Sequence, residues 1–241
     1  MAHRGLARLF PENTRASVLG ALDAGLRMAE IDVQLSSDGV PVLQHDADLA
    51  RMSGRAGDLR RLPWSRLKGV KMPEPGRFGR RFAREPLESL AGLAGALAGR
   101  GAFTLFVELK EESLRRFGRA FMLRSVAEAL APIRGRCVLI SFDHEALDLA
   151  RSATRFPVGP VLRRLDQARG KALRALRAEW TFCDRRLLPA RGPLAPLFGA
   201  SRLCVYEVPE ALDGRLLLDR GAAALETFRA DTLAQELALY A

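Results

Sequence analysis

Short apolar segments typical of β-strands alternate along this 241-residue chain with segments of helical periodicity that are rich in alanine, leucine and arginine. The strand-like segments fall at residues 29–35, 104–109, 137–142, 158–162, 180–183, 203–208 and 222–227. Helices are expected at about residues 14–24, 87–98, 114–131, 145–152, 167–177, 193–198, 209–218 and 232–240. Alternation of this kind predicts βα units around a parallel sheet.

The number of units makes the fold prediction more specific. Seven strands are visible, and an eighth would lie at residues 1–4, where only Met1 and Ala2 are apolar. Eight βα units in a chain of this length match a (β/α)8 TIM barrel, here with a shortened first strand. A doubly wound open sheet is the alternative, although the glycine-rich turn of its dinucleotide-binding form is missing. We expect an α/β fold of the TIM-barrel class, with one domain over residues 1–241.

Residues 47–85 interrupt the alternation. This segment contains many glycines, prolines and arginines and has no clean helical or strand period. We interpret it as an insertion on the barrel rim after the second strand, since long structured loops commonly shape access to a site. A solvated linker without a role is the alternative.

The formal net charge of +10 raises the question of an anionic partner. Only four of the 38 basic residues are lysines, and the arginines are scattered over the whole length. Arginines scattered in this way indicate a general bias toward this residue rather than a surface stripe that binds nucleic acid. No nucleic-acid partner is therefore expected. The densest cluster, at residues 77–84, is the exception.

Targeting signals and cysteine usage indicate the compartment. The chain has no apolar run of eighteen residues and no signal-peptide pattern, which predicts a soluble, cytoplasmic protein. Its three cysteines, Cys137, Cys183 and Cys204, lie far apart inside apolar runs. An odd number without close pairs predicts buried, reduced thiols rather than disulfides or a zinc site.

Two strands carry acidic residues at a spacing that predicts a common face. Glu30 and Asp32 are two residues apart, so their side chains point the same way while Ile31 points outward. The next predicted strand repeats this arrangement with Glu108 and Lys110. Active sites of these barrels lie at the carboxyl ends of the strands, where both pairs are found.

Three clustered carboxylates repel one another and are costly to bury, so a bound cation is the natural explanation. Ligation by oxygen alone suits Mg²⁺ or Ca²⁺ better than zinc, with Mn²⁺ as a further alternative. An acidic rim neutralised by arginines is the structural alternative.

Two of the chain's three histidines, His3 and His45, flank the acidic pair. Imidazoles titrate near neutral pH, and two of them beside a cation site supply the proton carriers that phosphoester chemistry needs. The third, His144, follows Asp143 and is expected at a capped helix amino terminus.

A long gapped pattern in the amino-terminal third resembles the signature of the glycerophosphodiester phosphodiesterases. Its elements are His3-Arg4-Gly5, Pro11-Glu12-Asn13-Thr14, Glu30-Ile31-Asp32-Val33, Asp38-Gly39, Val42, His45-Asp46, Leu49 and Arg51. The resemblance continues more loosely through Glu108-Leu109-Lys110 and Ser141-Phe142-Asp143.

The resemblance implies a TIM barrel that hydrolyses glycerophosphodiesters to glycerol 3-phosphate and an alcohol with the help of a divalent cation. It also implies roles for individual residues: the metal ligands would be Glu30, Asp32 and Glu108, the general acid and base His3 and His45, and the phosphate-binding residues Arg4 and Lys110. In the family, the glycerol hydroxyl attacks phosphorus, and water then opens the cyclic phosphate.

The chain departs from the family pattern at both ends. Only two residues precede His3, where family members have a full strand. Tyr206 stands where a tryptophan is usual, and we expect it to provide an aromatic wall for the glycerol or alcohol group. Phe228 replaces a carboxylate that would support the barrel mouth.

Two rival functions stay open at this stage. A related phosphodiesterase acting on lysophospholipids would make weak membrane-surface contact through residues 77–84, with Phe78 and Phe82 at the lipid. A noncatalytic barrel, damaged at its first strand, would bind phosphodiesters without turnover. The sequence makes no prediction about the oligomeric state.

Overall fold

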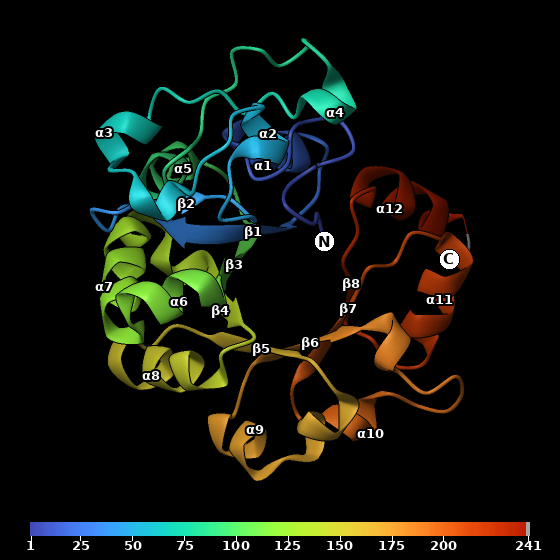
Figure 1. Ribbon diagram of the computed structural model, residues 1–241. Coiled ribbons are helices and arrows are strands. Elements are labelled where there is room, and N and C mark those ends of the chain that lie inside the picture. The colour runs from blue at the N-terminus through green and yellow to red at the C-terminus, as the bar shows by residue number, and fades with distance from the viewer. Residues whose placement is uncertain (240–241) are drawn as a thin grey trace.

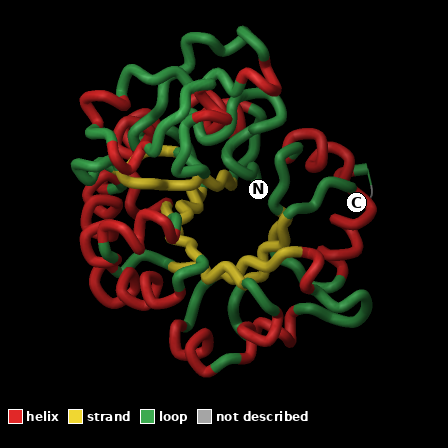
Figure 2. Tube along the Cα trace, viewed as in Figure 1, coloured by secondary structure: helices red, strands yellow, loops and turns green. Residues whose placement is uncertain are grey.

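The computed structural model describes residues 1–239 and contains a curled sheet of eight strands with helices around its outside (Figures 1 and 2). The strands are β1 (Met28–Leu35), β2 (Pro41–Leu43), β3 (Thr104–Leu109), β4 (Cys137–Ser141), β5 (Val158–Leu162), β6 (Trp180–Asp184), β7 (Arg202–Tyr206) and β8 (Ala224–Leu225). They are hydrogen-bonded in the order β2-β1-β3-β4-β5-β6-β7-β8, and only β2 runs antiparallel to its neighbour. This is the predicted TIM-barrel class of fold.

The strands are apolar because both of their faces are buried. Every residue of β4 and β5 is buried, as is usual for parallel strands covered by helices. Along β3, Leu105 and Val107 pack in the core between sheet and helices, whereas Phe106 faces the barrel interior. There Phe106 meets Trp180 and Phe182 edge to face, at centroid distances of 5.1 and 5.5 Å. Alternation thus separates an outer core from a filled barrel interior.

Residues 1–3 close the barrel between β8 and β1. The strand expected at residues 1–4 is reduced to a single bridging residue, Ala2, which pairs in parallel with Ala29 on one side and Thr227 on the other. The Ala2 carbonyl accepts the N–H of Glu30 at 2.8 Å, and the N–H of His3 donates to the Thr227 carbonyl at 3.1 Å. The predicted shortening of the first strand is therefore confirmed, and these hydrogen bonds hold His3 in the barrel wall.

Helices follow the strands nearly as predicted. The α-helices are α1 (Arg15–Asp23), α2 (Ala50–Ser53), α3 (Trp64–Leu67), α4 (Pro75–Phe78), α5 (Leu90–Leu97), α6 (Glu111–Phe117), α7 (Arg119–Ala129), α8 (His144–Thr154), α9 (Lys171–Leu176), α10 (Ala195–Phe198), α11 (Ala211–Asp219) and α12 (Ala230–Ala238). Four 3₁₀ helices are η1 (Leu59–Arg61), η2 (Ala131–Arg136), η3 (Leu165–Arg169) and η4 (Arg185–Leu187). The predicted last helix included residue 240, which lies outside the described residues.

Two helix predictions were wrong in detail. The single helix expected at 114–131 is two helices, because Gly118 between α6 and α7 has φ 86°, a left-handed conformation that interrupts the helical path. The helix expected at 167–177 is likewise a 3₁₀ turn, η3, followed by α9 after Gly170.

The rim segment at residues 47–85 folds around a small core of its own. It contains α2, η1, α3 and α4, which are too short to show a helical period in the sequence. Leu49, Met52, Leu59, Leu67 and Met72 are buried together there. The segment therefore is a packed structure rather than a solvated linker.

The three cysteines are buried and free, as predicted. Burial raises the pKa of Cys137 and of Cys183 to about 12, so both thiols stay protonated. Among residues 1–239, no helix combines the length and the apolar character needed to cross a membrane.

Candidate active site

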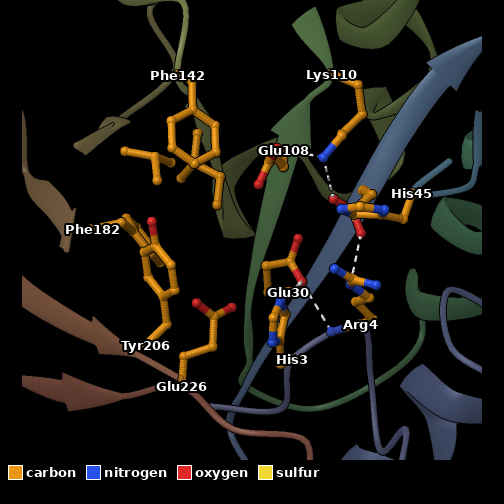
Figure 3. Close-up of a pocket in the computed structure, with 13 residues that line it drawn as sticks. His3, Arg4, Glu30, His45, Glu108, Lys110, Phe142, Phe182, Tyr206 and Glu226 are labelled. Atoms are coloured by element: carbon orange, nitrogen blue, oxygen red, sulfur yellow. Dashed lines mark hydrogen bonds and ion pairs between the residues drawn. The ribbon is translucent and has the colours of Figure 1, made fainter. Parts of the chain in front are cut away.

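A pocket lies where the barrel strands reach their carboxyl ends (Figure 3). It is lined by all eight residues that the sequence singled out, together with five others: His3, Arg4, Glu30, Asp32, His45, Glu108, Lys110, Ile140, Phe142, Val161, Phe182, Tyr206 and Glu226. The fold therefore brings the candidate residues together, and their roles stay predictions.

The acidic residues share one face, as their spacing predicted. Glu30 and Asp32 reach the pocket from β1, while Ile31 between them packs in the outer core. The parallel register sets Asp32 beside Glu108 of β3. Lys110 follows β3, and its Nζ lies 2.9 Å from Oε1 of Glu108 and 3.3 Å from Oδ1 of Asp32.

The surroundings separate the acidities of the three carboxyl groups. Burial raises the pKa of Glu30 well above its usual range, and the charge of Asp32 raises it further. Burial and Asp32 also raise the pKa of Glu108 to about 7, although Lys110 opposes this shift. Burial acts the same way on Asp32, but the charges of Lys110 and Arg4 outweigh it and hold the pKa of Asp32 below its usual range. Nearby cations thus compensate the negative charge of Asp32, whereas they compensate the charges of Glu30 and Glu108 only in part.

The three carboxylates fit a divalent cation. Glu30, Asp32 and Glu108 offer oxygen atoms that all lie within 4.8 Å of one another, and Oε1 of Glu30 is buried without a hydrogen-bond partner. Such an all-oxygen set suits a hard cation. Asn13 fixes Asp32 in place, because its amide donates to Oδ2 at 2.9 Å and its Oδ1 accepts the Asp32 N–H at 2.8 Å.

His3 is held between a carboxylate and an aromatic ring. Its Nδ1 lies 2.7 Å from Oε2 of Glu207, and its Nε2 lies 4.0 Å from Oε2 of Glu30. Phe228 stacks on the imidazole at 4.4 Å between centroids. Burial would lower the pKa of His3, but the carboxylates of Glu226 and Glu207 outweigh burial and raise it.

The turn after His3 aims the Arg4 side chain into the site. Arg4 has φ 55°, and its N–H donates to Oε2 of Glu30 at 2.9 Å. Its guanidinium donates to Oε1 of Glu12 at 2.8 Å and lies 3.2 Å from Oδ2 of Asp32. Arg4 and Lys110 thus place two cationic groups beside the carboxylates, where they can also bind an anionic group of a ligand.

Gly5 is required by this turn. It has φ 75°, and a Cβ at this position would lie 2.3 Å from Oγ of Ser17 and 2.7 Å from its carbonyl carbon. Gly5→Ala is expected to lower the free energy of unfolding by at least about 2 kcal/mol, from left-handed strain and overpacking together. Gly25→Ala is the matched control, since Gly25 has φ 82° with open space around it. Urea titrations that show equal losses for the two variants would contradict the close-packing argument.

His45 is oriented by a chain of charged groups. Its Nδ1 lies 2.6 Å from Oδ1 of Asp46. Arg51 donates to the other Asp46 oxygen at 2.7 Å and to Oε1 of Glu12 at 2.7 Å. Because Nδ1 is engaged, Nε2 of His45 is the ring nitrogen left for a ligand in the pocket.

Aromatic rings line the opposite side of the pocket. Phe142, Phe182 and Tyr206 lie across from Arg4 and His45 (Figure 3). Tyr206 occupies the position where the sequence predicted an aromatic wall, and Phe142 and Phe182 extend that wall beyond the prediction.

The sequence analysis missed two carboxylates, Glu226 and Glu207. Glu226 is 3% exposed and follows β8 into the pocket. Strand alternation was a signal that could have found it, because Ala224, two residues earlier, faces the barrel interior. Glu207 follows β7 and accepts the Phe228 N–H at 2.9 Å as well as binding His3. Phe228 replaces the carboxylate expected at its position, and Glu207 places a carboxylate beside His3 from another strand end.

His144 has the structural position expected for it. Asp143 caps α8 by accepting the N–H of Ala146 at 3.0 Å, and His144 begins the helix. Its Nε2 lies 3.1 Å from the carbonyl oxygen of Val161. His144 does not line the pocket that holds the other two histidines.

The rim cluster at residues 77–84 turns its aromatic rings inward. Phe78 and Phe82 are half-buried and pack edge to face at 5.1 Å, and Phe82 also contacts Phe10. Neither ring belongs to the exposed large apolar side chains of the described residues. The two rings therefore pack on the rim, and contact of this cluster with a membrane surface stays a prediction.

The chain resembles known proteins in sequence and in fold. A glycerophosphodiester phosphodiesterase of Caldanaerobacter subterraneus subsp. tengcongensis is 29% identical over 161 residues, which cover 66% of this chain and 64% of the relative. An uncharacterised protein of Mycobacterium tuberculosis is 35% identical over 117 residues, 46% of this chain and 38% of the relative. The matches thus span less than two thirds of the length of these relatives.

Solved structures show the same architecture. A phosphodiesterase of Oleispira antarctica in complex with the product sn-glycerol-3-phosphate superposes with a TM-score of 0.85 at 22% identity, covering 98% of this chain and 95% of that one. A glycerophosphodiester phosphodiesterase of Agrobacterium tumefaciens superposes with a TM-score of 0.78 at 22% identity, covering 97% of each chain. The family profile described as glycerophosphoryl diester phosphodiesterase matches residues 3–182. This chain belongs to the glycerophosphoryl diester phosphodiesterase family.

Proposed function

We propose that this protein hydrolyses glycerophosphodiesters to glycerol 3-phosphate and an alcohol by general acid–base catalysis, with the help of a divalent cation. The convergence of three carboxylates, two cationic side chains and two histidines in one pocket carries the proposal. Family membership supports the reaction class, and the Oleispira antarctica protein, whose structure contains sn-glycerol-3-phosphate, supports the substrate class.

The carboxylates are the proposed cation ligands. Glu30, Asp32 and Glu108 would hold Mg²⁺ or Ca²⁺, with Mn²⁺ as the alternative, because their oxygens cluster and Glu30 and Glu108 lack full compensation. When bound, such a cation neutralises phosphoryl charge and polarises the phosphorus–oxygen bonds. Arg4 and Lys110 bind the remaining phosphate oxygens and orient the diester.

The histidines are the proposed proton carriers. His3 and His45 each have Nδ1 held by a carboxylate, Glu207 and Asp46 respectively, which leaves both Nε2 atoms for the substrate. One imidazole removes the proton from the attacking hydroxyl, and the other protonates the leaving alcohol oxygen. If the glycerol hydroxyl attacks first, a cyclic phosphate forms, and the two histidines exchange roles when water opens it.

A direct assay tests the proposal. Purified protein is incubated with glycerophosphocholine and Mg²⁺, Ca²⁺ or Mn²⁺, and glycerol 3-phosphate is measured enzymatically. We expect metal-dependent release that stops with chelator and returns when metal is added back. Binding of the diester without turnover in any metal would support a noncatalytic barrel instead. Faster turnover of a lysophospholipid on vesicles than of glycerophosphocholine would favour the membrane-surface alternative.

Asp46 offers a test of the orientation of His45. Asp46→Asn keeps the shape of the side chain but removes the charge that holds Nδ1 of His45. We expect kcat to fall by about 10- to 100-fold, which is less than the full contribution of a general acid or base. Asp48→Asn is the control, because within residues 1–239 the Asp48 side chain accepts hydrogen bonds only from backbone N–H groups of its own loop. Equal kcat values for Asp46→Asn and wild type would show that Asp46 does not orient a catalytic imidazole.

A further inference from the structure

Glu226 is a buried acid whose charge is not used by the proposed reaction. Its side chain is 3% exposed and points into the pocket toward His3 and Glu30 (Figure 3). Its Oε1 has no hydrogen-bond partner, and no described lysine or arginine forms an ion pair with it. The amino group of Met1 donates to the carbonyl oxygen of Leu225 instead. Burial raises the pKa of Glu226, although the charges of His3 and of the Met1 amino group oppose this shift. A buried carboxylate with an unbonded oxygen and no lysine or arginine partner is costly, so the position favours a ligand that carries positive charge.

A second group of potential ligands surrounds Glu226. His3, Glu30 and Glu226 offer one atom each, and these atoms all lie within 4.8 Å of one another. Glu30 also belongs to the group with Asp32 and Glu108, and its own Oε1 has no partner. One carboxylate with two oxygens therefore lies between two clusters, as a bridging ligand would.

The two groups differ in chemistry. Glu30, Asp32 and Glu108 provide oxygen only and suit a hard cation, whereas the second group adds an imidazole nitrogen. One nitrogen with two carboxylate oxygens suits Zn²⁺ and related transition metals, with one position left open. Tetrahedral zinc holds such ligands about 3.4 Å apart, and Nε2 of His3 already lies 4.0 Å from Oε2 of Glu30. Small side-chain movements would bring the three ligand atoms to the separations that zinc requires.

His3 is prepared for metal binding through Nε2. Its Nδ1 is hydrogen-bonded to Glu207 at 2.7 Å, the carboxylate–histidine arrangement that fixes the ring and the tautomer of many metal-binding histidines. Phe228 stacks on the ring and limits its rotation. These contacts direct Nε2 toward Glu30.

We propose that His3, Glu30 and Glu226 form a second cation site, which takes a transition metal such as Zn²⁺ and inhibits the enzyme when filled. The inhibitory part rests on the proposed function, since Nε2 of His3 uses the same lone pair to bind a metal and to accept a proton. The binding part stands on the ligand geometry alone.

Zinc binding in excess Mg²⁺ tests the site without relying on activity. The full chain is dialysed against saturating Mg²⁺ and titrated with Zn²⁺, and bound zinc is measured by calorimetry and elemental analysis. Glu226→Gln keeps the size of the side chain and is expected to weaken zinc binding by at least about tenfold. Glu207→Gln, which removes the partner of Nδ1, is expected to weaken it by about 10- to 100-fold. Glu210→Gln changes the charge at an exposed site and is expected to bind zinc as wild type does.

Nuclear magnetic resonance identifies the ligand nitrogen. The chain has three histidines, so its imidazole ¹⁵N signals are few. Zinc is expected to shift Nε2 of His3 in the wild type, to leave His144 unchanged, and to have no such effect in Glu226→Gln. The circular dichroism spectrum of each variant establishes that it is folded. Equal zinc affinity of wild type and Glu226→Gln, or an unshifted His3 signal at saturating zinc, would overturn the second site.

Zinc inhibition of turnover tests the second half of the proposal. Each variant is compared with its own zinc-free rate, and zinc is expected to inhibit the wild type and Glu210→Gln at concentrations that leave Glu226→Gln active. Zinc that binds at His3 without slowing turnover would overturn the inhibitory part. A protein that binds zinc through Glu226 but releases no glycerol 3-phosphate in any metal would keep the site and refute the proposed function, so the two failures are distinguishable.

Discussion

Replacing either His3 or His45 with alanine is expected to lower kcat by about 10² to 10⁴, the usual contribution of a general acid or base. Both imidazoles line the pocket, and each has Nδ1 held by a carboxylate at 2.6 to 2.7 Å. Removing one ring leaves the carboxylates, Arg4 and Lys110 in place, so KM is expected to change less than kcat. Rates of glycerol 3-phosphate release with saturating metal measure both constants.

His144→Ala is the matched control for the two histidine variants. His144 lies outside the pocket, at the start of α8, and its Nε2 contacts only the carbonyl oxygen of Val161 among the described residues. We expect near wild-type kcat for this variant. Thermal unfolding is needed for His3→Ala, because the imidazole also stacks on Phe228. Near-normal kcat in His3→Ala or His45→Ala would refute the proton-transfer role of that residue.

Substitutions of the acidic residues give the second large effect: turnover is expected to fall in both variants, whereas stability is expected to change in opposite directions. Glu30→Gln and Asp32→Asn each remove a proposed cation ligand. A bound metal supplies several kcal/mol of transition-state stabilisation, and at about 1.4 kcal/mol per factor of ten, turnover should fall by at least about 10² in either variant.

Stability without metal separates the two variants. Burial and the charge of Asp32 raise the pKa of Glu30, so its ionised form is disfavoured in the fold and Glu30→Gln should raise the free energy of unfolding in chelator. Asp32 is paired with Lys110 and Arg4. Asp32→Asn should therefore lower the free energy of unfolding, because the buried Lys110 and the mostly buried Arg4 lose a partner.

Thermal denaturation in chelator and again in excess Ca²⁺ measures these effects. Added metal is expected to stabilise the wild type strongly and both variants weakly, since binding to the native state alone raises stability. If Glu30→Gln destabilises the metal-free protein as much as Asp32→Asn does, the assignment of uncompensated charge to Glu30 is wrong. If metal stabilises Asp32→Asn as fully as wild type, Asp32 is not a ligand.

Local patterns were sufficient to predict the barrel and the acidic face. Strands whose two faces are both buried consist of apolar residues, and such apolar runs are visible in the sequences of β4 and β5. The two-residue spacing of Glu30 and Asp32 predicted a common face because strand side chains alternate strictly. Pairing with Glu108 followed from strand order and was confirmed by the register.

The helix predictions failed where a single residue outweighed periodicity. Residues 114–131 have a helical pattern throughout, but Gly118 takes a left-handed conformation that separates α6 from α7. The rim segment contains helices although its sequence shows no helical period. These helices span only three or four residues and are stabilised by their own small core. Tertiary contacts decide such short elements.

The sequence by itself determined the fold class, the family signature and the residues that gather at the strand ends, since these depend on local alternation and on the order of strands. Only the tertiary structure decided how the barrel closes and what surrounds His3. Ala2 bridges β1 and the segment after β8, and its contact with Thr227 joins residues more than 200 positions apart. The same closure brings Glu207, Glu226 and Phe228 against His3. No local pattern encodes such contacts, because they depend on the packing of opposite ends of the chain.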